Sequence, residues 1–355
     1  MYREQDEDPT GELPDVLING PHEAPANPGF SFPAESDVST KRLSIWSHAI
    51  LAFVFAGFAC SAVAKHMYQY TDAQGIVHFT DVKPPDNTPG VKSTLVRTDA
   101  QPLLRSREDG SDEDRTIVFV NSAGGPITVE LDVTDAKNVR TEPEVLPARV
   151  VLPGRSETRA LHIVAIDPVA GFRYGYKYTY MPGDYRAVPD ENARYALPFP
   201  ANLKLRINQA FGGAFSHSEP QNKYAIDFGM PEGTPVLAAR DGTVMTVDND
   251  YYGNGLDMDK YGDRANNVRI AHDDGTMAVY AHLQLESARV QVGDRVRTGQ
   301  VLALSGDTGY TNGPHLHFVV QRNANMTMLS VPIQMVGANG KTFTPEEGMG
   351  VGGTP

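Results

Sequence analysis

The segment from Gly313 to Val320 places two histidines, His315 and His317, on either side of Leu316 in an otherwise apolar run. Alternate side chains of a β-strand point to the same face, so this run predicts a strand that presents both imidazoles on one face and buries Leu316 on the other. At a rise of about 3.4 Å per residue, the two rings lie about 7 Å apart, within reach of one metal ion. Taken alone, a His-x-His pair is equally compatible with a structural role.

Two other segments carry residues suited to binding a metal ion, and each lies beside a strand-like run. His282 directly follows Val279-Tyr280-Ala281, and Asp227 lies within Ala225-Ile226-Asp227-Phe228. His217 precedes that aspartate, with nine residues between them. Three histidine-bearing segments and one carboxylate favour a catalytic zinc site.

Together with their surroundings, these residues resemble the LytM/lysostaphin-type zinc endopeptidases, which cleave peptide cross-links in bacterial cell walls. The resemblance runs from about Phe211 to Val331 and rests on short motifs in a fixed order: Ala225-Ile226-Asp227-Phe228, Gly233-Thr234-Pro235-Val236, Asp241-Gly242-Thr243-Val244, Tyr280-Ala281-His282-Leu283, Val292-Gly293-Asp294-Arg295-Val296, Thr298-Gly299-Gln300 and Gly306-Asp307-Thr308-Gly309. It implies that one Zn²⁺ per chain is held by His217, Asp227 and His317. It also implies that His315 and His282 are the catalytic residues.

One position departs from the commonest pattern of that family. The first metal ligand usually lies four residues before the aspartate, where this chain has Lys223. An ammonium group offers a metal no free lone pair at neutral pH. His217 is the nearest histidine, and the loop that contains Pro220 and Asn222 is long enough to bring it back beside Asp227. We therefore expect His217 to be the first ligand, the alternatives being a substituted ligand or an inactive site.

Composition limits the remaining choices. A chain of 355 residues is expected to form two or three domains. Its 33 glycines and 26 prolines, together with short Val-, Ile- and Tyr-rich runs, favour a mainly β fold with antiparallel sheets. The net charge of −13, without a basic patch, argues against nucleic acid as a partner. With Cys60 as the single cysteine, the chain cannot form an intramolecular disulfide.

The N-terminal part of the chain carries an export signal. Lys41-Arg42 precedes an uncharged run that ends in Ala62-Val63-Ala64. This order predicts a signal peptide that is cleaved before Lys65, which places the mature chain in the periplasm or cell envelope, or outside the cell, without stable membrane insertion. The alternative is an inner-membrane anchor through residues 43–64. The acidic, Pro-containing segment before Val38 is expected to be a disordered tail or to precede the true start of translation at Val38.

Changes in hydrophobic pattern and in turn residues divide the chain into seven parts. The expected parts are a disordered or upstream segment (1–37), a signal peptide (38–64), a small hairpin module (65–90), a linker (91–115), a β-sandwich-like domain (116–195), a zinc metalloendopeptidase domain with an antiparallel sheet (196–335) and a flexible C-terminal tail (336–355). The small hairpin module resembles a module of unknown role that often follows the signal peptide in proteobacterial envelope proteins. Within the metalloendopeptidase domain, two Asp-Gly turns predict hairpins that join residues 236–239 to 243–247 and residues 268–271 to 277–281.

Several polar and aromatic residues have more than one interpretation. The insertion Tyr252–Arg264 either rims the substrate groove or is a surface loop, and its aspartates lack the helix–loop–helix context of an EF-hand calcium site. The tyrosines of Tyr174–Tyr180 share one strand face, where they either pack against the core or bind glycan. His78 and His162 are expected on strand surfaces, and His272 is expected to support a turn.

The resemblance implies a peptidoglycan endopeptidase that acts on stem-peptide cross-links through a zinc-activated water. In this scheme His315 takes the proton of the water, and His282 bonds the developing oxyanion or shares the proton. The main alternative is a catalytically silent LytM-type protein that binds the wall or activates an amidase. A third possibility is a transport or assembly factor in which the sandwich domain is the working part. The bond that is cleaved and the oligomeric state stay open.

Overall fold

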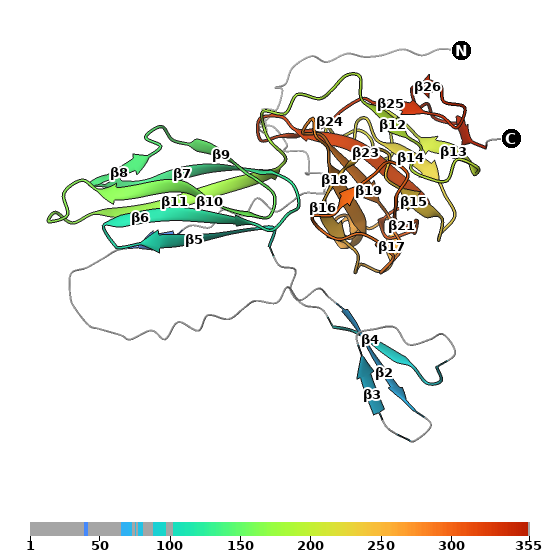
Figure 1. Cartoon of the computed structure of the whole chain (residues 1–355), viewed down its shortest axis with the longest axis horizontal. Coiled ribbons are helices and arrows are strands. Elements are labelled where there is room, and N and C mark those ends of the chain that lie inside the picture. Colours follow the sequence, from blue (N-terminus) through green and yellow to red (C-terminus); the bar gives the residue numbers. More distant parts are fainter. Residues whose placement is uncertain are drawn as a thin grey trace, which may run out of the picture.

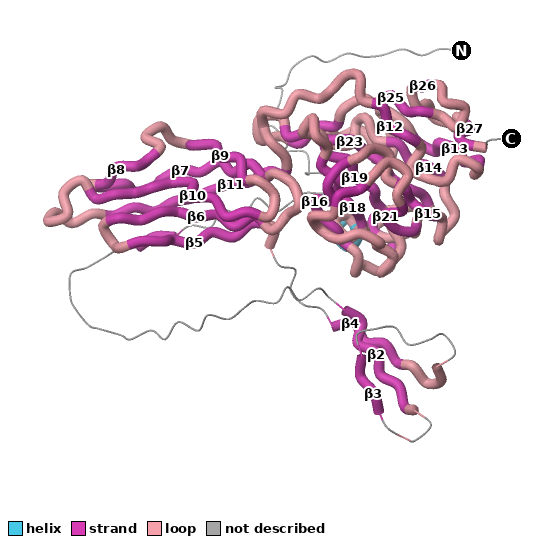
Figure 2. Tube along the Cα trace, in the orientation of Figure 1, coloured by secondary structure: helices cyan, strands magenta, loops and turns pink. Residues whose placement is uncertain are grey.

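The structure is a computed structural model that describes residues 39–41, 65–72, 75, 77–80, 88–96 and 102–353. Their regular secondary structure is nearly all β, and their one helix is α1 (Met258–Tyr261). The prediction of a mainly β, antiparallel fold is therefore confirmed. The strands form a small N-terminal sheet, a two-sheet sandwich and a larger C-terminal assembly (Figures 1 and 2).

The expected signal peptide and upstream tail lie outside the described residues, except for residues 39–41. Within the described part of the chain, which does not include residues 43–64, no helix is long and apolar enough to cross a membrane.

The small N-terminal sheet has three antiparallel strands in the order β3-β2-β4. Strand β2 (Lys65–Thr71) pairs with β3 (Val77–Thr80), which confirms the predicted hairpin, and its other side pairs with β4 (Lys92–Val96). Nε2 of His78 lies 2.7 Å from Oδ2 of Asp72, so this histidine is paired at the strand surface.

The sandwich consists of two four-stranded sheets with a hydrophobic core between them. Its strands, in the order of each sheet, are β5 (Leu104–Gly110), β6 (Asp114–Asn121), β10 (Ser156–Ala165) and β8 (Val139–Glu142), and then β1 (Ser39–Lys41), β11 (Arg173–Pro182), β7 (Ile127–Lys137) and β9 (Ala148–Leu152). The tyrosines of β11 face this core, since Tyr176 and Tyr178 are buried and Tyr174 and Tyr180 pack against the same cluster. The packing interpretation of the tyrosine row is confirmed.

Residues 91–115 were expected to form a linker, but strands β4 and β5 lie within this range. The linker prediction is wrong for the residues of these two strands. Strand β5 was missed because it is rich in charged residues and alternates only weakly between polar and apolar. It is an edge strand that pairs with β6 alone, and an edge strand tolerates charged side chains on its exposed positions.

A nine-stranded sheet dominates the C-terminal assembly. Its strands, in sheet order, are β20 (Arg295–Val296), β16 (Gly242–Asp248), β18 (Asn267–Ala271), β19 (Met277–Ala281), β23 (His315–Asn323), β14 (Ile226–Gly229), β13 (Lys204–Gln209) and β27 (Gly350–Gly352), with β24 (Met328–Ser330) paired to β23. Three smaller sheets join β12 (Arg194–Ala196) with β25 (Gln334–Val336) and β26 (Thr342–Phe343), β15 (Pro235–Leu237) with β21 (Val301–Leu304), and β17 (Asn254–Gly255) with β22 (Gly309–Tyr310).

Of the two hairpins expected in this region, one is confirmed and one is wrong. Strands β18 and β19 pair around the Asp274-Gly275 turn as predicted. Strands β15 and β16 do not pair with each other, because β15 pairs with β21 and β16 with β18 and β20. The carboxylate of Asp241 accepts hydrogen bonds from the backbone and side chain of Thr298, so contacts distant in sequence determine the conformation of this turn.

The C-terminal segment 336–355, expected to be a flexible tail, forms strands β26 and β27 within its described residues. Strand β27 pairs with β13 and adds an edge strand to the large sheet. The sequence of β27, Gly-Val-Gly, has no alternating apolar pattern that predicts a strand. Its glycines allow the backbone to pack closely against β13 and the residues before it, since a Cβ atom at Gly352 would lie 2.0 Å from the carbonyl oxygen of Leu203.

Strand β23 lies in the interior of the large sheet and has two different faces. Leu316, Phe318 and Val320 belong to the main hydrophobic core of the C-terminal assembly. His315 and His317 alternate with them and therefore lie on the opposite face. The strand and the common face predicted for the His-x-His pair are thus observed, and the site is built on this second face.

Candidate metal centre

The centre of the site is a pair of residues on neighbouring strands. Asp227 of β14 lies directly opposite His317 of β23 in the sheet register. Oδ1 of Asp227 is 2.9 Å from Nδ1 of His317, and both side chains are buried. Because both residues are on interior strands of the sheet, their relative position is determined by backbone pairing.

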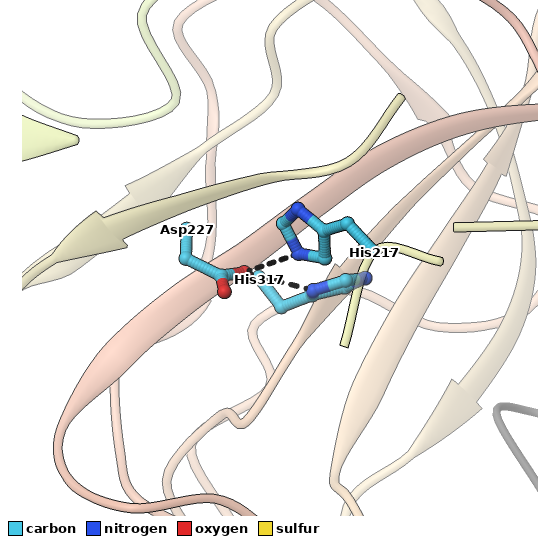
Figure 3. A group of neighbouring side chains, drawn as sticks. All are labelled: His217, Asp227 and His317. Carbon is cyan, nitrogen blue, oxygen red and sulfur yellow. Dashed lines mark hydrogen bonds and ion pairs between the residues drawn. The ribbon is translucent and has the colours of Figure 1, made fainter. Parts of the chain in front are cut away.

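His217 completes the group from a loop rather than from a strand. Its Nδ1 lies 2.8 Å from the carbonyl oxygen of Ala210, which only accepts, so Nδ1 carries a proton. Nε2 faces the site, where it donates to Asp227 when the ring is protonated and presents a lone pair when the ring is neutral. Nε2 lies 3.2 Å from Oδ1 of Asp227. The ligand atoms of His217, Asp227 and His317 all lie within 4.8 Å of one another (Figure 3).

The structure therefore brings His217 to Asp227 across the nine-residue loop, as the sequence suggested. Lys223, at the position where the family commonly has its first ligand, is directed elsewhere, with Nζ 5.7 Å from the centre of the Tyr224 ring.

Electrostatics keep the aspartate ionised. Burial raises the pKa of Asp227, but hydrogen bonds from His217 and His317 outweigh this and lower it well below its ordinary value. Burial lowers the pKa of His317. Burial also lowers the pKa of His217, but the hydrogen bond to Asp227 and its charge outweigh this, so the pKa of His217 is raised. The site therefore holds an anionic oxygen between two imidazoles.

The other two histidines predicted for the site lie beside this group. His315 stands 12% exposed in its side chain, with Nδ1 2.8 Å from the carbonyl oxygen of Gly313 and Nε2 3.9 Å from Oδ1 of Asp227. The ring of His282 is centred 4.5 Å from that of His315, and its Nδ1 lies 2.7 Å from the carbonyl oxygen of Thr308. Burial, helped by the neighbouring His315 and His317, lowers the pKa of His282 to about 3, so this ring is neutral at physiological pH.

His282 also has an unusual backbone. Its φ of 63° lies in the left-handed region, which a residue other than glycine occupies rarely and at some cost in energy. The conformation is held by hydrogen bonds on both sides: the N–H of Leu283 donates to the carbonyl of Asn266, and the N–H of Gly306 donates to the carbonyl of His282. The position of this ring therefore depends on the surrounding loops as well as on β19.

The group opens into a cavity of about 490 Å³. His282, His315, His317 and Asp227 line it, whereas His217 is fully buried behind them. The cavity is completed by Asn222 of the His217 loop and by polar and aromatic residues that sequence analysis did not single out: Asn208, Gln209, Phe215, Ser216, Tyr310 and Asn312. The sequence holds no signal for Gln209, because its place beside Asp227 comes from the pairing of β13 with β14, which exists only in the folded sheet.

The insertion Tyr252–Arg264 contributes Met258 and Gly262 to the cavity wall, so it does rim the site. Its Asp257 caps helix α1 by accepting a hydrogen bond from the N–H of Lys260. Among the residues that the structure describes, the group of His217, Asp227 and His317 is the one cluster with metal-binding geometry, and the aspartates of the insertion form none.

His162 and His272 lie outside the site, as expected. Nε2 of His162 is 2.7 Å from Asp114 on the sandwich surface. Nδ1 of His272 lies 2.7 Å from the carbonyl oxygen of Asp241, and its backbone closes the turn by bonding to Thr276, so it supports the turn.

Comparison with known proteins matches two parts of the chain to families. Residues 221–328 match Peptidase family M23, and residues 54–108 match a domain of unknown function, DUF4124. The chain is 38% identical over 104 residues to the glycyl-glycine endopeptidase ALE-1 of Staphylococcus capitis, a match that covers 29% of this chain and 25% of that protein. It is 31% identical over 194 residues to the peptidoglycan DD-endopeptidase ShyA of Vibrio cholerae, covering 51% of this chain and 40% of that protein.

Among solved structures, the catalytic domain of lysostaphin from Staphylococcus simulans is 30% identical and covers 34% of this chain and 81% of that domain, with a TM-score of 0.25. The matched region thus spans between a quarter and two fifths of the length of the two curated relatives.

Proposed function

Because the C-terminal part of this chain is a LytM/lysostaphin-type domain of peptidase family M23, we propose that the protein is a zinc metalloendopeptidase that hydrolyses peptide bonds in peptidoglycan cross-links. The observation that carries the proposal is the buried group of His217, Asp227 and His317 at the floor of an open cavity. The names of the two curated relatives, an endopeptidase and a peptidoglycan endopeptidase, support the substrate class.

The residues present fit a zinc ion. Two imidazoles and one carboxylate form a donor set typical of catalytic zinc sites, and three protein ligands leave a coordination position open. Asp227 is ionised and Nε2 of His217 faces the group, so the donors need little rearrangement. When bound there, zinc supplies Lewis acidity toward a carbonyl and a water molecule.

The two cavity histidines are suited to moving protons. In His315, Nδ1 is bonded to the carbonyl of Gly313, so the neutral ring presents the lone pair of Nε2 to the cavity. His282 has the same tautomer, because its Nδ1 is bonded to the carbonyl of Thr308. The low pKa of His282 makes it a weak base. We therefore assign to His315 the removal of a proton from the attacking water. We assign to His282 a share in this proton transfer and, once its own Nε2 is protonated, a hydrogen bond to the oxyanion that develops on the substrate carbonyl.

The proposal is tested by zinc content and by hydrolysis of purified cross-linked peptidoglycan. The wild-type protein is expected to hold one zinc ion and to release cross-link peptides. His217→Ala, Asp227→Ala and His317→Ala are each expected to lose both metal and activity, because each removes a ligand.

Lys223→Ala is the matched control, since Lys223 occupies the usual ligand position but points away from the group. It is expected to keep metal and activity. A wild-type protein that takes up no zinc after reconstitution would overturn the enzyme proposal and favour a silent, wall-binding protein. A His217→Ala protein with unchanged zinc affinity would remove His217 from the ligand set.

We further propose that the mature enzyme begins at Lys65 and acts in the periplasm or cell envelope. The supporting observation is the order of a basic pair, an uncharged run and Ala62-Val63-Ala64. N-terminal sequencing of the exported protein tests this. A chain that retains residues 43–64 would instead be anchored in the inner membrane.

A further inference from the structure

Gln209 lies at the end of β13, directly opposite Asp227 in the sheet register, and it lines the cavity. Its side-chain amide makes three contacts. Nε2 lies 3.3 Å from Oδ2 of Asp227 and 2.8 Å from Oγ of Ser216, and Oε1 accepts a hydrogen bond of 3.1 Å from the backbone N–H of Phe215. One side chain thus connects the carboxylate to the loop that carries His217.

The contacts determine which way the amide points. Oε1 must face the N–H of Phe215, because an NH₂ group there would meet another donor. Nε2 then necessarily faces Asp227, where it is the right partner for an ionised carboxylate. The amide therefore binds Oδ2 of Asp227, whereas His217 and His317 both face Oδ1.

The same side chain supports the loop of His217 from below. A Cβ atom at Gly213 would lie 2.1 Å from Cγ of Gln209, so the glycine is needed for the loop to pass over this side chain. The N–H of His217 then bonds to the carbonyl of Gly213, and its Nδ1 bonds to Ala210, the residue that follows Gln209. Both ligands on this side of the group thus depend on residues 209 and 210.

We propose that Gln209 is a positioning residue of the metal centre, in an inference that rests on the proposed zinc site. It occupies Oδ2 of Asp227, which leaves Oδ1 as the single oxygen for the metal, and it holds the loop so that His217 faces that oxygen. This chain needs such a connection because His217 lies on a loop, with nine residues between it and Asp227. Hydrogen-bond partners of metal ligands typically contribute about 10- to 100-fold to metal affinity.

Two substitutions in the full chain separate the hydrogen bond that Gln209 donates to Asp227 from the packing of its side chain under the His217 loop. Gln209→Met keeps a side chain of similar length but loses both hydrogen-bonding groups. Gln209→Glu keeps an acceptor for the N–H of Phe215 and replaces the donor by a second carboxylate beside Asp227. Gln291→Met, at an exposed glutamine outside the cavity, is the matched control.

Zinc affinity is measured by competition with a chromophoric chelator, and the coordination is followed in the visible absorption spectrum after Co²⁺ replaces zinc. Both Gln209 variants are expected to bind zinc about 10- to 100-fold more weakly. The cobalt bands of Gln209→Met are expected to weaken, because a released Oδ2 adds a second oxygen ligand and raises the coordination number. Circular dichroism of the metal-free proteins verifies that the variants are folded.

Wild-type affinity and an unchanged cobalt spectrum in Gln209→Met would overturn this assignment. Wild-type affinity in Gln209→Glu alone would also overturn it, because the donor to Asp227 would then be dispensable. A wild-type chain that binds neither zinc nor cobalt would instead refute the metal site itself, and with it the proposed function.

Discussion

His272 predicts a measurable acid sensitivity of the fold. Its side chain is 5% exposed, and Nδ1 donates to the carbonyl of Asp241, so the neutral ring has its lone pair on Nε2. Nε2 is buried and has no hydrogen-bond partner among the described residues. A proton added there would be a buried, unsatisfied charge close to Arg240. Burial accordingly lowers the pKa of His272 to about 4.

The size and the sign of the effect follow from linkage. In the unfolded chain a histidine has a pKa of about 6.5, whereas His272 in the folded chain has a pKa of about 4. Between these values the unfolded chain binds a proton that the folded chain does not, so the free energy of unfolding decreases as the pH falls. The slope is about 1.4 kcal/mol per pH unit, and the total loss between pH 7 and pH 4 is about 3 kcal/mol.

Urea unfolding of wild type and His272→Asn, at several pH values from 7 to 4.5, measures this contribution. Asparagine keeps an N–H donor near the position of Nδ1 and does not titrate in this range. A chelator in all samples removes the effect of pH on metal binding. The wild type is expected to lose stability faster than the variant as the pH falls below about 6.5.

At pH 7 the free energies of unfolding of wild type and His272→Asn also differ because asparagine is smaller than histidine. The test is therefore the pH dependence of the unfolding free energy and not its value at pH 7. His162→Asn, at the exposed histidine of β10, controls for removal of an imidazole from the protein. Parallel plots of unfolding free energy against pH for wild type and His272→Asn would refute the reasoning. They would mean that Nε2 of His272 finds an acceptor or that the folded turn opens to admit the proton.

Three further outcomes are expected. His315→Ala should keep its zinc but hydrolyse peptidoglycan about 10²- to 10⁴-fold more slowly, as measured by zinc content and product release, and loss of the metal would reverse the roles of the two strand histidines. Met277→Ala should lower the free energy of unfolding in urea by about 2–5 kcal/mol, because this side chain is 1% exposed in the core shared with the sandwich; a change below 1 kcal/mol would contradict that burial. Removal of residues 348–355 should lower the melting temperature, because it removes the buried Val351 and leaves the edge of β13 unpaired, and an unchanged melting temperature would show that β27 contributes nothing.

The parts of the fold that sequence analysis predicted correctly are those determined by neighbouring residues. Two histidines separated by one leucine in an otherwise apolar run identified β23 and the common face of these histidines. An Asp-Gly turn between two apolar runs identified the hairpin of β18 and β19. In both cases the side-chain period of two along a strand carries the information, and no distant partner is needed to interpret it.

The incorrect predictions concern strands whose structure depends on residues that are distant in the sequence. Strand β15 pairs with β21, and β27 pairs with β13, across long separations in the sequence that no local pattern reveals. Strand β5 is charged because it is an edge, and whether a strand is an edge is known only from the assembled sheet. The candidate site shows the same division, since four of its five histidine and aspartate positions follow from motifs and His217 follows as the histidine nearest to Asp227. Gln209 and the aromatic residues of the cavity wall are recognised only after folding brings them there.

The junction between the sandwich and the large sheet is another feature that only the folded structure reveals. Met245 and Met277 of the large sheet belong to the hydrophobic cluster of the sandwich core. The N–H of Gly124 donates to the carbonyl of Met245, and a Cβ atom at this glycine would lie 2.0 Å from the carbonyl oxygen of Val244. Two units that share one core and a close backbone contact are expected to unfold together. Because Met277 begins β19 and this strand ends just before His282, one strand connects the core of the sandwich to the wall of the cavity, and a loss of packing at Met277 is expected to reach His282 through it.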